Sequence, residues 1–473
     1  MQNVSSSHRL ALGRLKSLPG ACRAVTAGHW HLLARAGWVA ALSLGVKLSA
    51  MTKDIVVAGR FGASADLDAF LVAYAVPMVV WSIVSQSFSS SFMPTLIRVR
   101  EQSGPSSAHE LIRSMMAKVI VGLAVLAVLL AAGAPWFLPV LAPGFDPQQR
   151  AVTLTLCRIL LWIVPCCGLA TYWGAILNSC EVFTVVAMAP ASFPVMMLVS
   201  LYGFVPRFGI EALAWGAVAG YAAEMLILGG AMLRRRLPVL PSLRAHDQAG
   251  HMVRQYLFLL SGAVLMSSTI LVDQSMATWT GQGSVTVLNY GNKPVAVLLG
   301  TISLGVGTAV FPHFSRLAAS GDAAAIRKTL RSLVLVVTAI TIPLTAVLML
   351  LSRPLAEALF QRGAITPETI SAIARVQCCY LLQVPAYVAG ILGVRTLMAL
   401  GGASTITRIA AANLGVNVVA NLVFLRFFGI AGIALSTSCV YLFSTTLVYY
   451  RLAHRLRKLA PLPEAVWEGA KAA

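Results

Sequence analysis

Twelve predominantly apolar stretches dominate the sequence, each about as long as the 20 residues that a helix needs to cross the hydrocarbon core of a bilayer. Only 11% of the 473 residues are charged and 58% are hydrophobic, whereas about 25% of a soluble protein is charged. A cytosolic enzyme, a secreted domain and a disordered scaffold are therefore excluded, and we expect an all-α polytopic membrane protein. The predicted spans are residues 37–58, 68–92, 115–140, 152–177, 182–204, 210–232, 255–279, 285–311, 330–351, 371–394, 405–425 and 428–450.

The distribution of basic residues predicts how the chain is oriented. With the N-terminus inside, 25 of the 36 Lys and Arg residues fall in cytoplasmic segments and 6 fall in external ones, as the positive-inside rule requires. The formal net charge of +20 is therefore a topology signal and does not indicate nucleic-acid binding. We expect both termini in the cytoplasm, with a basic arm at 1–36, which can lie on membrane lipids, and a tail at 456–473.

Landmarks in the first half of the chain recur in the second half at one nearly constant offset. Asp54 corresponds to Asp273, and the proline pair Pro147 and Pro165 corresponds to Pro367 and Pro385. The offsets all lie between 218 and 220 residues, so the chain is predicted to consist of two parallel six-helix repeats. The expected N-lobe covers 37–240 and the C-lobe covers 241–455, in a MOP/MATE-like arrangement around a central cavity. This architecture is typical of transporters.

Ionisable residues at membrane depth are the candidate functional residues, because such groups are costly in lipid and usually face a cavity or a partner. Three lysines from both halves can converge on the central cavity and bind a polyanionic headgroup such as a diphosphate, since Lys binds phosphate as a point charge. Three acidic residues accompany them. The six predicted substrate-binding residues are Lys47, Lys53, Lys293, Asp54, Asp68 and Asp273.

A structural alternative for the same charges is that Lys47 pairs with Asp54, that Lys53 reaches to the membrane interface, and that Lys293 pairs with Asp273. Glu224 in the sixth span is either a coupling site for a proton or cation or a carboxyl kept neutral by burial. A polar stripe on the eleventh span either lines the cavity or bonds neighbouring helices, with the second role favoured. The stripe consists of Asn413, Asn417 and Asn421.

Motifs of catalysis and metal binding are missing from the sequence. It contains no HExxH, P-loop or GxSxG pattern. The eight cysteines show no CxxC spacing and no neighbouring His, so we interpret them as inert thiols. We therefore expect neither an enzyme nor a cofactor or metal site.

Several segments resemble the MurJ (MviN) lipid II flippase family of the MOP superfamily. The clearest are KDIVVAGRFGASADLDAFLVAYAVP at 53–77, SSSFMPTLIRVREQSG at 89–104, GSVTVLNYGNKP at 283–294 and GVGTAVFPHFSRLAASGD at 305–322. The resemblance implies a flippase of the bacterial inner membrane that moves an undecaprenyl-diphosphate-linked saccharide from the inner to the outer leaflet. In that family cavity arginines contact the headgroup, and the resemblance places Lys47, Lys53 and Lys293 at basic positions of that cluster, with Asp54 and Asp68 at its acidic positions.

The sequence departs from the family pattern in three respects. Its three cavity cations are Lys rather than Arg, the arginine pair expected in the second span is replaced by Trp81 and Ser82, and family members carry two further spans. Another glycan lipid, such as an exopolysaccharide or O-antigen unit, is therefore an alternative cargo. A MATE-like cation or drug antiporter, and a non-transporting scaffold among cell-wall or polysaccharide synthesis proteins, are the alternative functions.

Overall fold

The computed structural model describes residues 20–242, 264–265, 267–319 and 322–459. Within these ranges the chain is almost entirely helical and contains no β-strand, which confirms the predicted all-α class. Most of the predicted arm and tail, residues 1–19 and 460–473, lies outside the described residues, as does most of the link between the two halves, residues 243–263. The first long helix begins at Gly20, inside the predicted arm, and continues into the first predicted span without a break.

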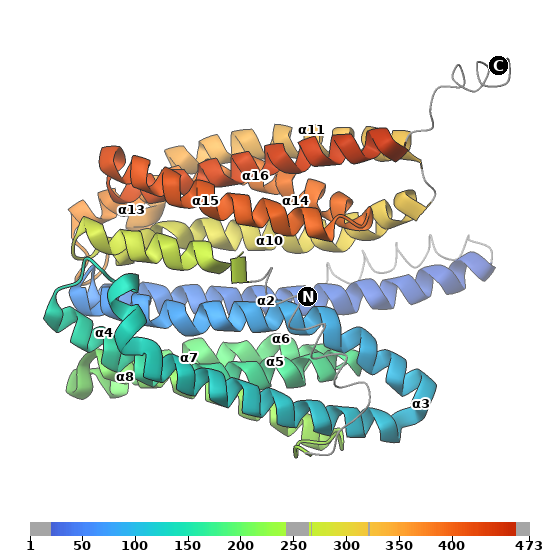
Figure 1. The fold of residues 1–473 in the computed structure, drawn as a ribbon, viewed down its shortest axis with the longest axis horizontal. Coiled ribbons are helices and arrows are strands. Elements are labelled where there is room, and N and C mark those ends of the chain that lie inside the picture. Colours follow the sequence, from blue (N-terminus) through green and yellow to red (C-terminus); the bar gives the residue numbers. More distant parts are fainter. Residues whose placement is uncertain (1–19, 243–263, 266, 320–321, 460–473) are drawn as a thin grey trace, which may run out of the picture.

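The first half of the chain forms one helical bundle, coloured blue to green in Figure 1. Its elements are α2 (Gly20–Phe61), α3 (Ala65–Leu141), α4 (Pro147–Leu160), α5 (Ile163–Ser179), α6 (Phe183–Met188), η1 (Ala189–Ala191), α7 (Ser192–Gly203) and α8 (Val205–Arg234).

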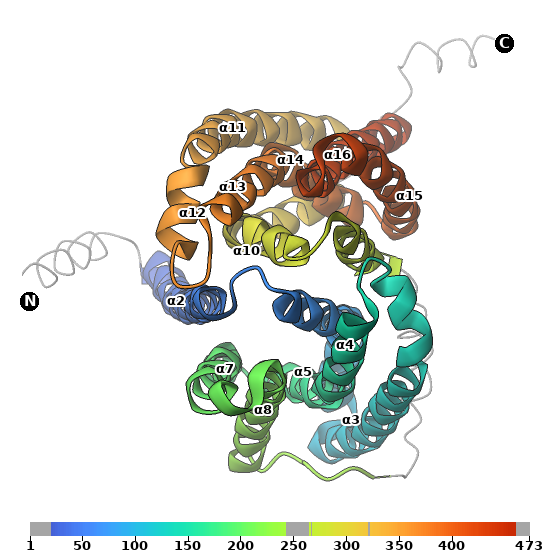
Figure 2. The same cartoon turned by 90° about the vertical axis from the view of Figure 1, so that its left-hand side faces the viewer.

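The second half forms another bundle, coloured yellow to red, which lies above the first in both views (Figures 1 and 2). It starts with a helix over residues 267–277. The following elements are η2 (Thr278–Thr280), α10 (Ser284–Ala319), α11 (Ala323–Leu350), α12 (Ser352–Phe360), α13 (Pro367–Leu381), α14 (Gln383–Ala399), α15 (Ala403–Phe428) and α16 (Ile430–Leu459). Helices α2 and α3 of the first bundle face α10 of the second (Figure 2).

The predicted spans coincide with these helices. Nine of the described helical segments are long and apolar enough to cross a membrane, and the remaining predicted spans fall on α2, on residues 264–277 and on α10. The second and third spans are joined within the 77-residue helix α3, whose regular geometry is interrupted at Gly104, with φ of 83°. Glycine adopts this left-handed conformation readily because it has no Cβ.

The internal sequence repeat is also visible in the structure, as prolines at matching helix positions in the two halves. Helices α4 and α13 both begin with a proline, Pro147 and Pro367, after a residue whose side chain caps the helix. Proline suits the first turn because the amide hydrogen that it lacks would be unpaired there. The following helices, α5 and α14, each carry a proline at their third residue, Pro165 and Pro385. The two halves are therefore built alike, as the constant offset predicts.

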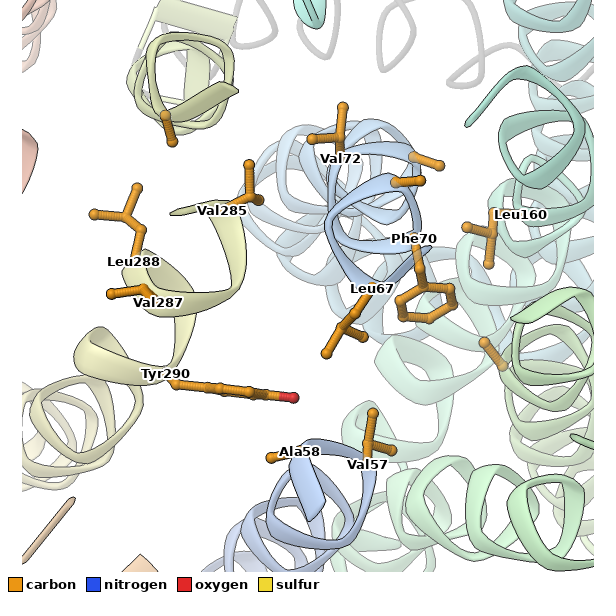
Figure 3. Packing of buried hydrophobic residues seen from close by; sticks show 14 of the residues in the cluster. Val57, Ala58, Leu67, Phe70, Val72, Leu160, Val285, Val287, Leu288 and Tyr290 are labelled. Carbon is orange, nitrogen blue, oxygen red and sulfur yellow. The ribbon is translucent and has the colours of Figure 1, made fainter. Parts of the chain in front are cut away.

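Buried apolar side chains form a continuous cluster that crosses from one bundle to the other (Figure 3). The part of it that joins α2 and α3 to α10 lies near the turn between α2 and α3. This part includes Val57 and Ala58 of α2, Leu67 and Phe70 of α3, and Val285, Leu288 and Tyr290 of α10. The two lobes are therefore in apolar contact near this turn.

Small residues allow α7 and α8 to pack closely. The sequence GAVAG in α8 places Gly216 and Gly220 one turn apart, facing α7. A Cβ atom at Gly216 would lie 2.4 Å from the Cβ of Ser200, and one at Gly220 would lie 2.7 Å from the Cα of Phe193. Such small-residue pairs let membrane helices pack backbone to backbone, where van der Waals contact drives association.

The substitution Gly220→Ala should destabilise the first lobe, because the added methyl group meets the backbone of α7. Overpacking of this kind costs about 1–3 kcal/mol. The matched control is Gly230→Ala on the same helix, where a Cβ would have no neighbour within 4 Å. Thermal unfolding in detergent should show a lower melting temperature for Gly220→Ala and an unchanged or higher one for Gly230→Ala; equal melting temperatures would contradict this packing.

Candidate functional site

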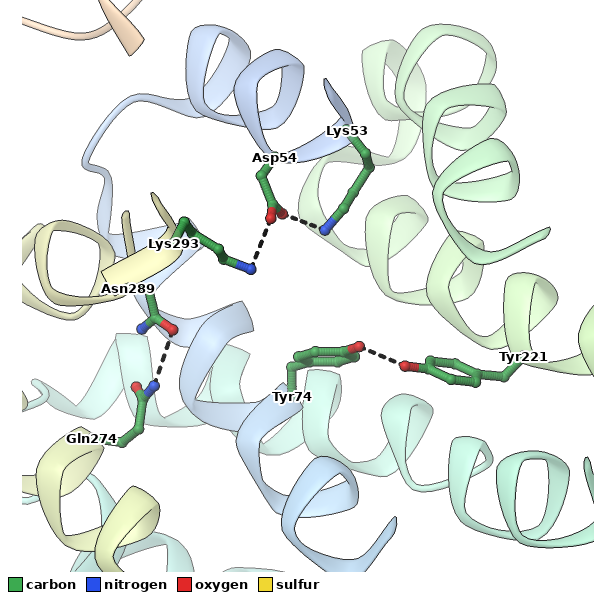
Figure 4. Close-up of polar contacts among 7 residues, drawn as sticks. All are labelled: Lys53, Asp54, Tyr74, Tyr221, Gln274, Asn289 and Lys293. Carbon is green, nitrogen blue, oxygen red and sulfur yellow. Dashed lines mark hydrogen bonds and ion pairs between the residues drawn. The ribbon is translucent and has the colours of Figure 1, made fainter. Parts of the chain in front are cut away.

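A cluster of three charged side chains joins the two lobes (Figure 4). Lys53 and Asp54 are neighbours on α2, and Lys293 lies on α10. Asp54 forms ion pairs with both lysines, through Oδ1 with Lys53 and through Oδ2 with the Nζ of Lys293 at 2.8 Å. The structure therefore brings together three of the six predicted site residues. It does not show the alternative pairing of Lys293 with Asp273.

The cluster carries one positive charge more than its carboxylate neutralises. Lys53 and Asp54 are each only 8% exposed, while the side chain of Lys293 is 36% exposed. The Nζ of Lys53 also lies 5.1 Å from the centre of the Phe193 ring, a cation–π arrangement that partly offsets the loss of hydration. A charge held in surroundings of low dielectric interacts strongly with any anion that comes close.

The cluster lines a cavity of about 170 Å³ between the lobes. Polar and aromatic side chains that were not predicted as site residues also line this cavity, among them Tyr74, Phe193, Gln274 and Asn289. One signal was present in the sequence, because Asn289 precedes Lys293 by four residues and so shares its face of α10. Gln274 and the aromatic residues carry no such signal, since they come from other helices.

Lys47 lies two helical turns before Asp54 on α2. It forms no ion pair with any residue that the structure describes. A Cβ atom at Gly300 of α10 would lie 3.2 Å from the Nζ of Lys47, so this lysine also reaches from α2 to α10. Lys47 is therefore close to the charged cluster in sequence but is not part of it in this structure.

Asp273 lies in the C-lobe, on the helix over residues 267–277. Its Oδ1 accepts hydrogen bonds from the amides of Asn417 at 3.0 Å and Asn421 at 2.7 Å, and its Oδ2 accepts one from Thr437 at 3.3 Å. The third member of the predicted polar stripe, Asn413, donates to Ser444 at 3.0 Å. The stripe therefore bonds neighbouring helices, which is the favoured interpretation.

A second cavity lies next to Asp273, within the C-lobe. It has a volume of about 400 Å³, and Asn413 and Asn417 contribute to its lining. The structure thus places Asp273 in a different cavity from Lys53, Asp54 and Lys293.

Asp68 connects the lobes at the end nearest the α2–α3 turn. Its Oδ2 accepts a hydrogen bond from the amide of Gly283 at 2.6 Å, and its Oδ1 accepts from the amide of Thr286 at 2.8 Å and the hydroxyl of Thr286 at 2.6 Å. These groups form the start of α10. There a carboxylate accepts hydrogen bonds from amides that have no partner within the helix, and its negative charge interacts favourably with the positive end of the helix dipole. Asp68 is fully buried and does not line the cavity of the charged cluster.

Three further hydrogen bonds join the lobes at the same end, onto which Figure 2 looks. The amide of Gly144 donates to the hydroxyl of Thr278 at 3.2 Å, and the hydroxyl of Ser275 donates to the carbonyl of Val140 at 3.1 Å. The amide of Ala364 donates to the carbonyl of Gly59 at 2.9 Å. With Asp68 and the apolar cluster, these bonds close this end of the space between the lobes.

The other residues singled out from the sequence, Glu224, Trp81 and Ser82, lie in the N-lobe. Glu224 is half-buried on α8 and forms no ion pair with a residue that the structure describes. Trp81 donates to the hydroxyl of Thr171 at 3.2 Å, and the hydroxyl of Ser82 lies 2.8 Å from that of Ser267. The positions expected to hold arginines therefore carry neutral groups that bond nearby helices.

Comparison with known proteins identifies the family. A profile described as lipid II flippase MurJ matches residues 57–467. The lipid II flippase MurJ of Burkholderia cenocepacia is 26% identical over 433 residues, covering 88% of this chain and 83% of that protein. The probable lipid II flippase MurJ of a Synechocystis species is 25% identical over 452 residues, covering 90% and 82%.

Solved structures show the same fold. A lipid II flippase MurJ in an inward closed conformation has a TM-score of 0.77, with 18% identity and 89% of both chains covered. An inward-facing MATE-family multidrug resistance transporter of the MOP superfamily has a lower TM-score of 0.66, with 13% identity, covering 89% of this chain and 98% of that one. Because the family profile covers most of its length, the chain belongs to the lipid II flippase MurJ family.

Proposed function

We propose that this protein is a flippase that moves a polyprenyl-diphosphate-linked saccharide, lipid II or a related glycan lipid, from the inner to the outer leaflet. The observation that carries the proposal is the charged cluster, in which lysines from both lobes share one carboxylate. The uncompensated positive charge in an inter-lobe cavity suits a diphosphate. The membership of the family supports the same cargo class.

The chemistry of the cavity disfavours the MATE-like alternative. The cavity contains aromatic side chains, but Lys53 and Lys293 would repel an organic cation, and both carboxylate oxygens of Asp54 are already ion-paired with these lysines. Lysine also differs from the arginine of the family pattern, because it binds a phosphate as a point charge without bidentate geometry. The site therefore recognises negative charge rather than a particular phosphate geometry. This is compatible with several different glycan lipids.

Transport of such a cargo requires the lobes to move apart. The cavity of about 170 Å³ is smaller than the roughly 300–1,000 Å³ of typical small-molecule sites, so a diphosphate and a sugar do not fit together in this state. We infer alternating access, in which the lobes rock about the central cavity. Asp68 would then belong to a gate that holds one end closed, rather than contacting the cargo directly.

The positive-inside rule supports an assignment of the closed end to the outer face of the bacterial inner membrane, with both termini in the cytoplasm. The cargo headgroup would enter from the cytoplasmic side while its polyprenyl chain stays among the membrane lipids. Proteins of cell-wall or polysaccharide synthesis would supply and consume the cargo. A scaffold of such a complex would need none of the cavity charges, so charge substitutions distinguish the two functions.

The substitution Lys293→Ala should lower transport, because the phosphate loses its contact with the C-lobe. Hydrogen bonds to charged groups contribute about 1.5–3 kcal/mol, so we expect a loss of about ten- to a hundredfold. Lys293→Arg should retain transport, and Lys328→Ala, at an exposed position on α11, is the matched control. The measurement is the accumulation of lipid-linked saccharide in a strain whose own gene is depleted. Normal saccharide levels with Lys293→Ala would favour the scaffold.

The substitution Asp68→Asn should weaken closure of the gate, because the amide replaces one of the two acceptor oxygens with a donor. Spin labels at the exposed positions Asp66 and Gln282 of a cysteine-free chain would report the inter-lobe distance. We expect a shift of the distance distribution to longer values. Asp146→Asn is the control, because Asp146 caps α4 within its own lobe. An unchanged distribution with Asp68→Asn would refute the gate.

A further inference from the structure

Gln274 and Asn289 form a pair of amides whose orientation is fixed by the backbone. The Nδ2 of Asn289 donates to the carbonyl of Val285 at 2.8 Å, so its Oδ1 faces away from that carbonyl. This Oδ1 accepts a hydrogen bond from the Nε2 of Gln274 at 3.3 Å. Only the NH₂ group of an amide can donate. The two bonds therefore fix the Nε2 of Gln274 as the atom that faces Asn289, and its Oε1 takes no part in them.

The Oε1 of Gln274 is a buried acceptor without a hydrogen-bond partner among the residues that the structure describes. Gln274 is only 8% exposed and lines the same cavity as Lys53, Asp54 and Lys293. Nearly all buried polar atoms in proteins are hydrogen-bonded. An orphaned acceptor beside a ligand cavity is therefore a position at which a donor group of the ligand gains a bond.

The amide pair lies at a defined position relative to the cations. Asn289 precedes Lys293 by four residues on α10, so both project from one face and are separated by about 6 Å along the helix axis. Figure 4 shows Asn289 and Gln274 on the same side of the cavity as Lys293. In a glycosyl diphosphate, the substituent on carbon 2 of the first sugar is only a few bonds from the nearer phosphate. Gln274, Asn289 and Lys293 all belong to the C-lobe, so their spacing does not depend on the gap between the lobes. When the lobes part, a phosphate on Lys293 therefore brings that substituent within reach of the amide pair.

We propose that Gln274 is a specificity residue that accepts a hydrogen bond from an N–H or O–H group on carbon 2 of the first sugar. This inference rests on the proposed function, because it needs the diphosphate on the lysines. Gln274 does not bind the phosphate, since an amide oxygen and a phosphate oxygen are both acceptors. The lysines thus select the anionic link, and Gln274 selects the sugar that is attached to it.

The test measures binding to the full chain in lipid nanodiscs with three probes. They are polyprenyl diphosphate, a polyprenyl-diphosphate hexose with a 2-acetamido group, and its 2-deoxy analogue. The unsubstituted protein should bind the 2-acetamido compound about tenfold more tightly than the 2-deoxy compound, which corresponds to one hydrogen bond. Gln274→Met, of similar size but with no amide acceptor, should abolish this preference and leave the affinity for polyprenyl diphosphate unchanged. Gln102→Met, at an exposed position, should retain the preference.

Two results would overturn the inference while leaving the proposed function intact. One is equal affinity of the unsubstituted protein for the 2-acetamido and 2-deoxy compounds, a comparison that depends on no substitution. The other is an equal loss of affinity for polyprenyl diphosphate and for the sugar lipid in Gln274→Met. If the unsubstituted protein bound none of the three probes, the proposed function itself would fail, and the inference with it.

Discussion

The ion pairs of Asp54 with lysines from both lobes are the interaction on which the proposed mechanism depends. Removing two ammonium groups and a carboxylate from water is costly, and the cost is offset only while the charges remain close together. Asp54 therefore holds Lys293 of the C-lobe against Lys53 of the N-lobe. An anionic headgroup could replace the carboxylate of Asp54 as the partner of Lys293. It would then neutralise the lysine and at the same time break the ion pair that links the lobes.

The same arrangement relates the cavity to the closed end. Asp54 lies one helical turn before Ala58, which is part of the apolar contact between the lobes, and α10 carries both Lys293 and the helix start that Asp68 caps. A displacement of Lys293 along the axis of α10 would therefore act on the bonds of Asp68 through the same helix. This is a physical route by which occupation of the cavity can bias the gate, because both act on α10.

The features that depend on a single helix or on the internal repeat could be predicted from the sequence. The spans follow from hydropathy, and the duplicated proline positions follow from the constant offset. The convergence of Lys53 and Lys293 followed from their depth and from their origin in different halves. The pairing of the charges could not be predicted in this way, because it depends on the distance between α2 and α10. For the same reason the sequence did not show that Asp68 caps α10 or that Asp273 is bonded within the C-lobe.

The proposed function requires that the protein recognise the diphosphate of a lipid-linked saccharide and carry this lipid across the bilayer. The most direct test is a leaflet assay in proteoliposomes that contain only the purified chain and labelled lipid. It compares a polyprenyl-diphosphate saccharide with a polyprenyl saccharide that lacks the phosphates, and follows the fraction that a membrane-impermeant enzyme can reach. We expect rapid transfer of the diphosphate compound alone. Equal transfer of both compounds, or of neither above protein-free liposomes, would contradict the proposed function.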